Sequence, residues 1–144
     1  MEKIIAISHE LNSGEIYKKN QRFVLLDTNF ILTCIRQKID FFNEIELMGM
    51  GIIIPKEVIE EIKKIKNSTK KLKYRDEAVI SLNLLEIKKF KTAILNEKIV
   101  DKGIVKFAKQ NPDAVIATLD RGIKSRIPNK KLIIRGKKKL EITR

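Results

Sequence analysis

The sequence predicts an α/β domain with three layers, in which helices cover both faces of a central, mainly parallel sheet. Short apolar runs alternate along the chain with longer segments whose apolar residues recur at helical spacing. The runs are apolar on both faces, as strands buried on both sides require. The 144 residues fit one ordinary domain, and no internal repeat or Gly/Ser linker divides them. Strands that alternate with helices in such a chain predict a parallel sheet between two helical layers.

The apolar runs and the helical spacing give the elements in order. Strands are predicted at 23–26, 51–54, 92–95, 114–118 and 132–134. Helices are predicted at 30–37, Lys56–Lys66, 76–89 and 98–109, although Gly103 is awkward inside the last of them. Pro55 fits the first turn of the second helix. The segments at 111–112 and 120–122 have the composition of turns.

The ends of the chain and its single cysteine suggest how the domain is organised and located. Residues 1–21 are expected to form an N-terminal extension, a strand followed by a basic loop, before a domain at 22–144. The apolar piece at 1–8 lacks the basic start and the length of a signal peptide. Cys34 has no partner for an internal disulfide, which fits a reducing cytoplasm. The chain has no apolar run of about 18 residues, so we expect no membrane partner.

The charge predicts a polyanionic partner. Lys and Arg number 31 against 18 acidic residues, which gives a net charge of +13. Such an excess attracts nucleic acid through its phosphates. The alternative is a solvated surface of the kind found in heat-adapted proteins, because charged residues make up 34% of the chain against about 25% in typical domains.

Two aspartates follow predicted strands. Asp27 directly follows the first strand, and Asp120 lies two residues after Thr118 at the end of the fourth. Ligand sites in parallel sheets form outside the carboxyl ends of the strands, so we expect both carboxylates at one edge. The alternative for each is a helix cap, because aspartate before a helix is a good N-cap.

Helical phase selects two further acids. In Lys56–Lys66 the apolar stripe places Glu61 at its border and Glu60 nearly opposite, in solvent. Asp101 is expected to point among the buried residues of its helix, where a carboxylate is costly unless it is paired, capped or bound to a metal. Its alternative is the cap of a helix that starts at Lys102.

Four carboxylates at one edge would repel one another and raise their own pKa values. A hard divalent cation such as Mg²⁺ or Mn²⁺ would relieve this repulsion, since both ions prefer oxygen ligands. Such ions polarise phosphoryl oxygens and lower the pKa of a bound water. The acids therefore predict metal-dependent chemistry on a phosphate.

The four acidic segments together resemble the motifs of the PIN-domain family. The run at 24–29 resembles its opening motif, 55–62 its second, Asp101 with Ile104 and Ala108 its third, and 117–121 its fourth. The resemblance implies a PIN-like fold and an endoribonuclease that leaves a 5′-phosphate and a 3′-hydroxyl. It also implies that Asp27, Glu61, Asp101 and Asp120 hold Mg²⁺ or Mn²⁺, without a small organic cofactor.

Two polar residues beside the acids would orient them, according to the same resemblance. They are Asn29 and Thr118, which otherwise would be a helix cap and a strand-end residue.

One branch of the family matches the sequence further. The runs 27–31 and 35–40, with Arg121, Lys124 and Arg126, are similar to the PIN endonucleases that process small-subunit ribosomal RNA precursors. Toxins of the VapC type are the nearest alternative branch. At the third motif Lys102 stands where the first branch often has a second acid. The resemblance implies RNA, including precursor ribosomal RNA, as the partner, and a homodimer.

The basic segments at 63–75, 121–126 and 135–139 are expected to bind RNA mostly by electrostatics, with a solvated face as the alternative. The residues are Lys63, Lys64, Lys70, Lys71, Lys73, Arg75, Arg121, Lys124, Arg126, Arg135, Lys137, Lys138 and Lys139.

Two rival functions use the same acids. A catalytically inactive PIN scaffold would bind RNA or protein without cutting. An aspartyl-phosphate enzyme would use Asp27 as a nucleophile. Phosphatases of the dehalogenase type need a second Asp where this chain has Asn29, and receiver domains need an Asp where it has Asn96.

Overall fold

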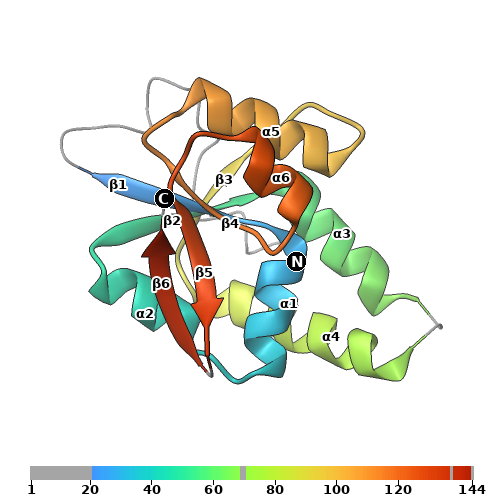
Figure 1. The fold of residues 1–144 in the computed structure, drawn as a ribbon. Coiled ribbons are helices and arrows are strands. Elements are labelled where there is room, and N and C mark those ends of the chain that lie inside the picture. Colours follow the sequence, from blue (N-terminus) through green and yellow to red (C-terminus); the bar gives the residue numbers. More distant parts are fainter. Residues whose placement is uncertain (1–20, 69–70, 137, 144) are drawn as a thin grey trace.

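The computed structural model describes residues 21–68, 71–136 and 138–143 (Figure 1). The strands are β1 (Arg22–Leu26), β2 (Met50–Pro55), β3 (Lys91–Ala93), β4 (Val115–Ala117), β5 (Lys131–Arg135) and β6 (Lys139–Thr143). The helices are α1 (Thr28–Arg36), α2 (Phe41–Leu47), α3 (Lys56–Lys66), α4 (Leu72–Ile87), α5 (Val100–Gln110) and α6 (Arg121–Arg126). The strand expected at 1–8 lies outside the described residues.

The sheet has the order β3-β2-β1-β4-β5-β6, and all neighbours are parallel except β5 and β6. The order reverses where β1 lies beside β4, with Leu26 opposite Ala117. The backbone N–H of Asp27 donates to the carbonyl of Ala117 at 3.0 Å, which ties the two strand ends together. In open α/β sheets this reversal is where ligands bind, outside the carboxyl ends of the strands.

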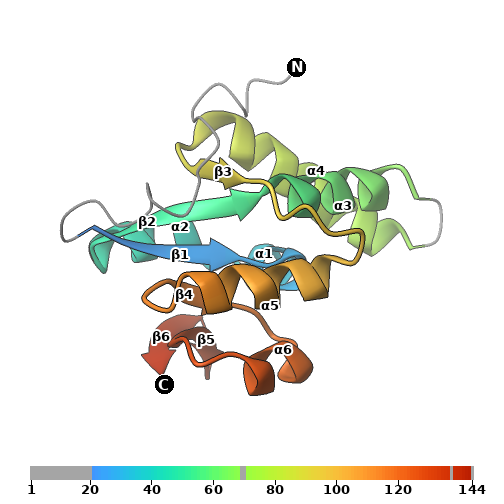
Figure 2. The same cartoon turned by 90° about the horizontal axis from the view of Figure 1, so that it is seen from above.

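Side chains of alternate residues in β1 enter two separate cores. Val24 and Leu26 pack with residues of α1, α2, α3 and α4, whereas Phe23 and Leu25 pack with residues of α5 and α6. Figure 1 shows α5 and α6 above the sheet and α1, α2 and α4 below it, and Figure 2 shows the strands side by side from above. The expected three-layer α/β/α fold with a mainly parallel sheet is confirmed.

Several elements differ from the sequence prediction. α4 begins at Leu72 rather than at Asp76, and α2, α6 and β6 had not been predicted. α6 occupies most of the expected turn at 120–122, because the Asp120 side chain caps it. β6 pairs antiparallel with β5 at the sheet edge and takes up most of what had been expected as a basic end. Its exposed Lys139 is a common device of edge strands.

Two further features are the burial of the single cysteine and the character of the helices. Cys34 is buried in α1, and burial raises the pKa of its thiol to about 12. Within the described ranges, none of the helices has both the length and the apolar character to cross a membrane.

Candidate active site at the carboxyl edge of the sheet

Asp27 lies at the centre of the edge where the strand order reverses. It is the N-cap of α1, and only 6% of the residue is exposed. Its Oδ1 accepts from the backbone N–H of Thr28 at 2.8 Å, and its Oδ2 accepts from the hydroxyl of Thr118 at 2.8 Å. The alternative that Asp27 caps a helix is therefore confirmed, and the same carboxylate lies at the strand end, at the edge of the sheet.

The environment of Asp27 opposes its negative charge. Burial is the largest cause that raises its pKa, to about 6, and the hydrogen bonds from Thr118 and Thr28 oppose the rise. The charges of Asp101 and Glu61 raise the pKa further. These two carboxylates come from helices on opposite faces of the sheet, α5 and α3, and their like charges disfavour the charged form of Asp27.

Glu61 and Glu60 differ as the helical phase predicted. Glu61 is half-buried, and its Oε1 accepts from the hydroxyl of Thr28 at 2.5 Å, while Glu60 is exposed. The stripe of Val58, Ile59 and Ile62 faces the core and turns Glu61 toward the sheet edge.

The expectation that Asp101 points among the buried residues of α5 is wrong, because Asp101 is exposed. It is not a cap either, because α5 begins at Val100 and its N-cap is Ile99. Asp101 shares the helix face of Ile104 and Ala108 but lies in the first turn. We attribute its exposure to this position at the end of the helix.

Asp120 caps α6 through its Oδ1, which accepts from the N–H of Ile123 at 3.1 Å. Its own N–H donates to the Thr118 hydroxyl at 3.1 Å, so Thr118 connects Asp120 with Asp27. The charges that raise the pKa of Asp27 do not include that of Asp120. Hydrogen bonds of Thr28 and Thr118 thus link Glu61, Asp27 and the backbone of Asp120.

Of the two expected orienting residues, Thr118 forms a hydrogen bond with one of the acids and Asn29 does not. Thr118 is fully buried and holds Asp27 as described. Asn29 is exposed in the first turn of α1 and lines a pocket together with Asp120. The alternative of Asn29 as the helix cap is wrong, because Asp27 is the cap.

Thr28 and Glu57 make contacts near this edge that the sequence did not predict. Thr28 bonds both Asp27 and Glu61. The carboxylate of Glu57 accepts from the N–H groups of Leu95 and Asn96 at 3.1 Å, which fixes the connection from β3 to α5. The glycine at position 103 was the one sequence signal of a close contact between α5 and this connection. A Cβ at Gly103 would lie 2.8 Å from the Leu95 Cβ, so α5 needs glycine to approach the connection.

The chemistry of the donors fits a hard divalent cation. Asp27, Glu61, Asp101 and Asp120 offer only oxygen atoms, which Mg²⁺ and Mn²⁺ prefer. Among the described residues, no three His, Cys, Asp or Glu side chains are positioned together as ligands of one ion. Instead, three of these carboxylates accept hydrogen bonds from nearby hydroxyl or backbone groups.

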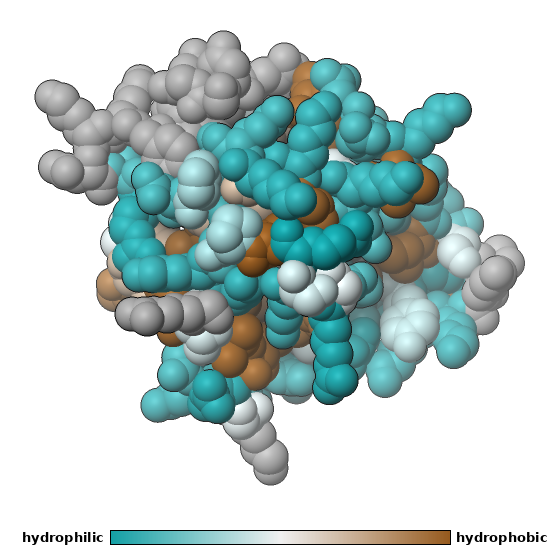
Figure 3. Space-filling model, turned by 45° about the horizontal axis from the view of Figure 1, so that its top comes forward, coloured by the Kyte–Doolittle hydropathy of each residue, from teal (hydrophilic) through white to brown (hydrophobic). Residues whose placement is uncertain are grey.

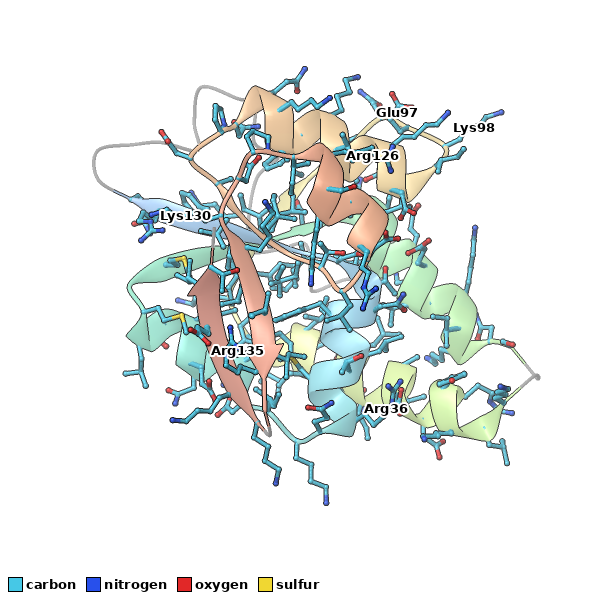
Figure 4. All side chains as sticks on the ribbon, in the orientation of Figure 1. Arg36, Glu97, Lys98, Arg126, Lys130 and Arg135 are labelled. Carbon is cyan, nitrogen blue, oxygen red and sulfur yellow. The ribbon has the colours of Figure 1, made fainter. Side chains whose placement is uncertain are left out.

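The basic residues expected to bind RNA come from three regions. Lys63, Lys64, Lys71, Lys73 and Arg75 lie on α3, on α4 or beside them, and Arg121, Lys124 and Arg126 lie on α6. Arg135, Lys138 and Lys139 belong to the β5–β6 hairpin, where Arg135 forms an ion pair with Glu141. Lys70 and Lys137 lie outside the described residues. Figure 4 shows Arg126 and Arg135 well apart, and Figure 3 shows mostly hydrophilic residues on the face above α5 and α6.

The fold and the edge define a class: a three-layer α/β domain with carboxylates where the strand order reverses. A family model described as "PIN like domain" matches residues 24–137, and the chain belongs to this family.

Two relatives extend this assignment. The chain is 29% identical over 125 residues to Ribonuclease VapC4 of Methanocaldococcus jannaschii. The matched region covers 83% of this chain and 95% of the relative. It is also similar to the structure of the PIN domain endonuclease Utp24, with a TM-score of 0.67, 26% identity, and coverage of 83% of this chain and 90% of that one.

Proposed function

We propose that this chain is a metal-dependent endoribonuclease whose active site is the edge around Asp27. The observation that carries the proposal is a buried carboxylate, at the reversal of strand order, whose charge two further carboxylates oppose. A cation at this edge would relieve that repulsion. The similarity to Ribonuclease VapC4 supports RNA as the substrate.

Mg²⁺ or Mn²⁺, when bound, would polarise the phosphate and lower the pKa of an attacking water. Asp27, Glu61, Asp101 and Asp120 would hold the ion directly or through water. Thr118 and Thr28 would fix the orientation of the carboxylates, as polar neighbours do in metal sites. Glu57 would position the first turn of α5, and with it Asp101.

Cleavage of a structured RNA tests this proposal. We expect cutting in millimolar Mn²⁺, none in chelator, and products with 5′-phosphate and 3′-hydroxyl ends. A protein that binds the RNA but leaves it intact in Mn²⁺ would support the inactive scaffold instead.

We further propose ribosomal RNA precursors as the substrate, with a VapC-type toxin activity as the second candidate. The resemblance of residues 27–31 and 35–40 to the PIN endonucleases that process ribosomal RNA precursors, together with the basic α6, favours the first, and the similarity to VapC4 favours the second. Crosslinking in cells, followed by mapping of the bound RNA, separates them. Enrichment at ribosomal processing sites supports the first, and enrichment on other RNAs contradicts it. The homodimer and the cytoplasmic location stay predictions.

RNA binding is expected to be mainly electrostatic. Log K should fall with log salt at a slope of about −0.7 for each phosphate contact on a single strand. Neutralising Lys71 and Lys73 should make the slope shallower, while neutralising Lys88 and Lys89, which are also exposed near the other end of α4, should leave it unchanged. Equal slopes for all three proteins would remove the start of α4 from the interface.

A further inference from the structure

A pocket of about 410 Å³ lies beside the proposed active site, lined by residues of α1, α3 and α4 and by Leu119 and Asp120. Leu32, Ile65 and Leu119 contribute apolar side chains to its lining. Arg36 and Tyr74 add a cation and an aromatic ring, and Asp120 lines it on the side of the catalytic edge. Its volume lies in the range of pockets that hold small ligands, roughly 300–1,000 Å³.

The guanidinium of Arg36 is held in place by a buried carboxylate, that of Glu77. Glu77, only 6% exposed, accepts from Nε of Arg36 at 2.8 Å and from Nη2 at 2.9 Å. This two-point contact fixes the plane of the guanidinium. Figure 4 shows Arg36 where α1 faces α4.

Tyr74 is exposed beside two cations. The guanidinium carbon of Arg36 lies 5.7 Å from the centre of the Tyr74 ring, and the ammonium of Lys71 lies 5.4 Å from it. The residue is 41% exposed, so a ligand can reach it. Together, Tyr74 and Arg36 form a cationic and aromatic surface on one side of a pocket whose other lining residues are both apolar and polar.

We propose that this pocket receives one unpaired nucleobase of the RNA strand, next to the phosphate that is cut. A base offers a flat face for the guanidinium and the ring, while Lys71 neutralises a neighbouring phosphate. A base inside a duplex cannot reach such a pocket, so the site selects unpaired nucleotides. The inference rests on the proposed function, because it takes RNA as the substrate.

Binding in chelator tests the proposal without cleavage. The probes are single-stranded RNA oligonucleotides that carry 2-aminopurine, whose fluorescence falls on stacking, at successive positions. We expect quenching at one position. Tyr74→Leu should abolish this quenching and weaken binding about five- to 150-fold, the equivalent of about 1–3 kcal/mol for one stacked base. Tyr74→Phe keeps the ring and should behave as the wild type.

Ile80→Ala is the matched control, because Ile80 is an exposed α4 residue (52%) outside the pocket lining. An abasic nucleotide at the quenched position should weaken binding to the wild type by the same factor as Tyr74→Leu. Combining the abasic nucleotide with that variant should cause no further loss. If the variant does not fold, the abasic series on the wild type decides.

Three results would each overturn the proposal of a base-binding pocket. In the first, Tyr74→Leu and Ile80→Ala both bind RNA as tightly as the wild type does. In the second, an abasic nucleotide weakens binding at no position, and in the third, duplex RNA binds as tightly as single strands. The failure of this inference is distinguishable from failure of the proposed function. Binding that depends on Tyr74, without cleavage in Mn²⁺, would refute the nuclease and keep the pocket. Cleavage that depends on Asp27, with binding independent of Tyr74, would refute the pocket alone.

Discussion

Replacing Asp27 by Asn should stabilise the metal-free protein at neutral pH. Asn is also a good N-cap, so α1 keeps its cap, and the Thr118 hydroxyl can accept from the new amide. The pKa of Asp27 rises from 3.8 to about 6 in the folded protein. At about 1.4 kcal/mol for each pH unit between the two values, the carboxylate costs the folded state about 3 kcal/mol at pH 7.

The sign of the pH dependence follows from the direction of the shift. Between about pH 4 and pH 6 the folded state binds more protons at Asp27 than the unfolded state does, so its contribution to stability falls as the pH rises. Urea unfolding of both proteins should therefore give similar free energies near pH 4. The variant should gain about 3 kcal/mol by pH 7, with no further change above.

Mn²⁺ should remove part of this difference, because an ion that binds only the folded wild type stabilises it by about 2.7 kcal/mol at a hundredfold excess over Kd. The variant should respond little. A variant that is less stable than the wild type at pH 7, by an amount that does not change with pH, would refute the reasoning. In that case the Asp27 carboxylate would be only a favourable cap.

Three further changes probe the same edge. Glu61→Gln should lower cleavage in saturating Mn²⁺ about 100-fold, while exposed Glu60→Gln stays within a few-fold of the wild type; the reverse order would contradict the helix phase. Thr118→Val removes a buried hydroxyl that forms two hydrogen bonds. The free energy of unfolding should therefore fall by about 1–3 kcal/mol and the affinity for Mn²⁺ by about 10–100-fold. Unchanged affinity for Mn²⁺ would show that the role of Thr118 is structural only. Gly103→Ala places a Cβ 2.8 Å from Leu95, so the free energy of unfolding in urea should fall by about 1–3 kcal/mol and cleavage should slow. Full activity would show that cleavage does not depend on how the first turn of α5 positions Asp101.

The sequence predicted the parts of the fold that depend on continuous apolar runs. β1 and β4 are buried on both faces, so their residues identify them without reference to the rest of the chain. α6 has six residues and relies on the Asp120 cap, so a turn describes its sequence equally well. β6 is an edge strand rich in polar residues, and only its pairing with β5 distinguishes it from a charged tail.

The candidate site was predictable where local geometry decided it. Helical phase distinguished Glu61 from Glu60, and the strand ends brought Asp27 beside Thr118. The contacts of Thr28 and Glu57 were not predictable, because each joins elements separated by more than 30 residues in the chain. The exposure of Asp101 depends on where α5 starts, and helix boundaries are the least certain feature of a sequence prediction.

Direct counting of bound Mn²⁺ tests the central claim, because it needs no knowledge of the RNA. The electron paramagnetic resonance signal of free Mn²⁺ is measured as wild-type protein or Asp27→Asn is added. The wild type should remove the signal saturably, and Asp27→Asn should bind Mn²⁺ at least tenfold more weakly. Equal binding by the two proteins, or no binding by either, would contradict a metal site at the carboxyl edge of the sheet.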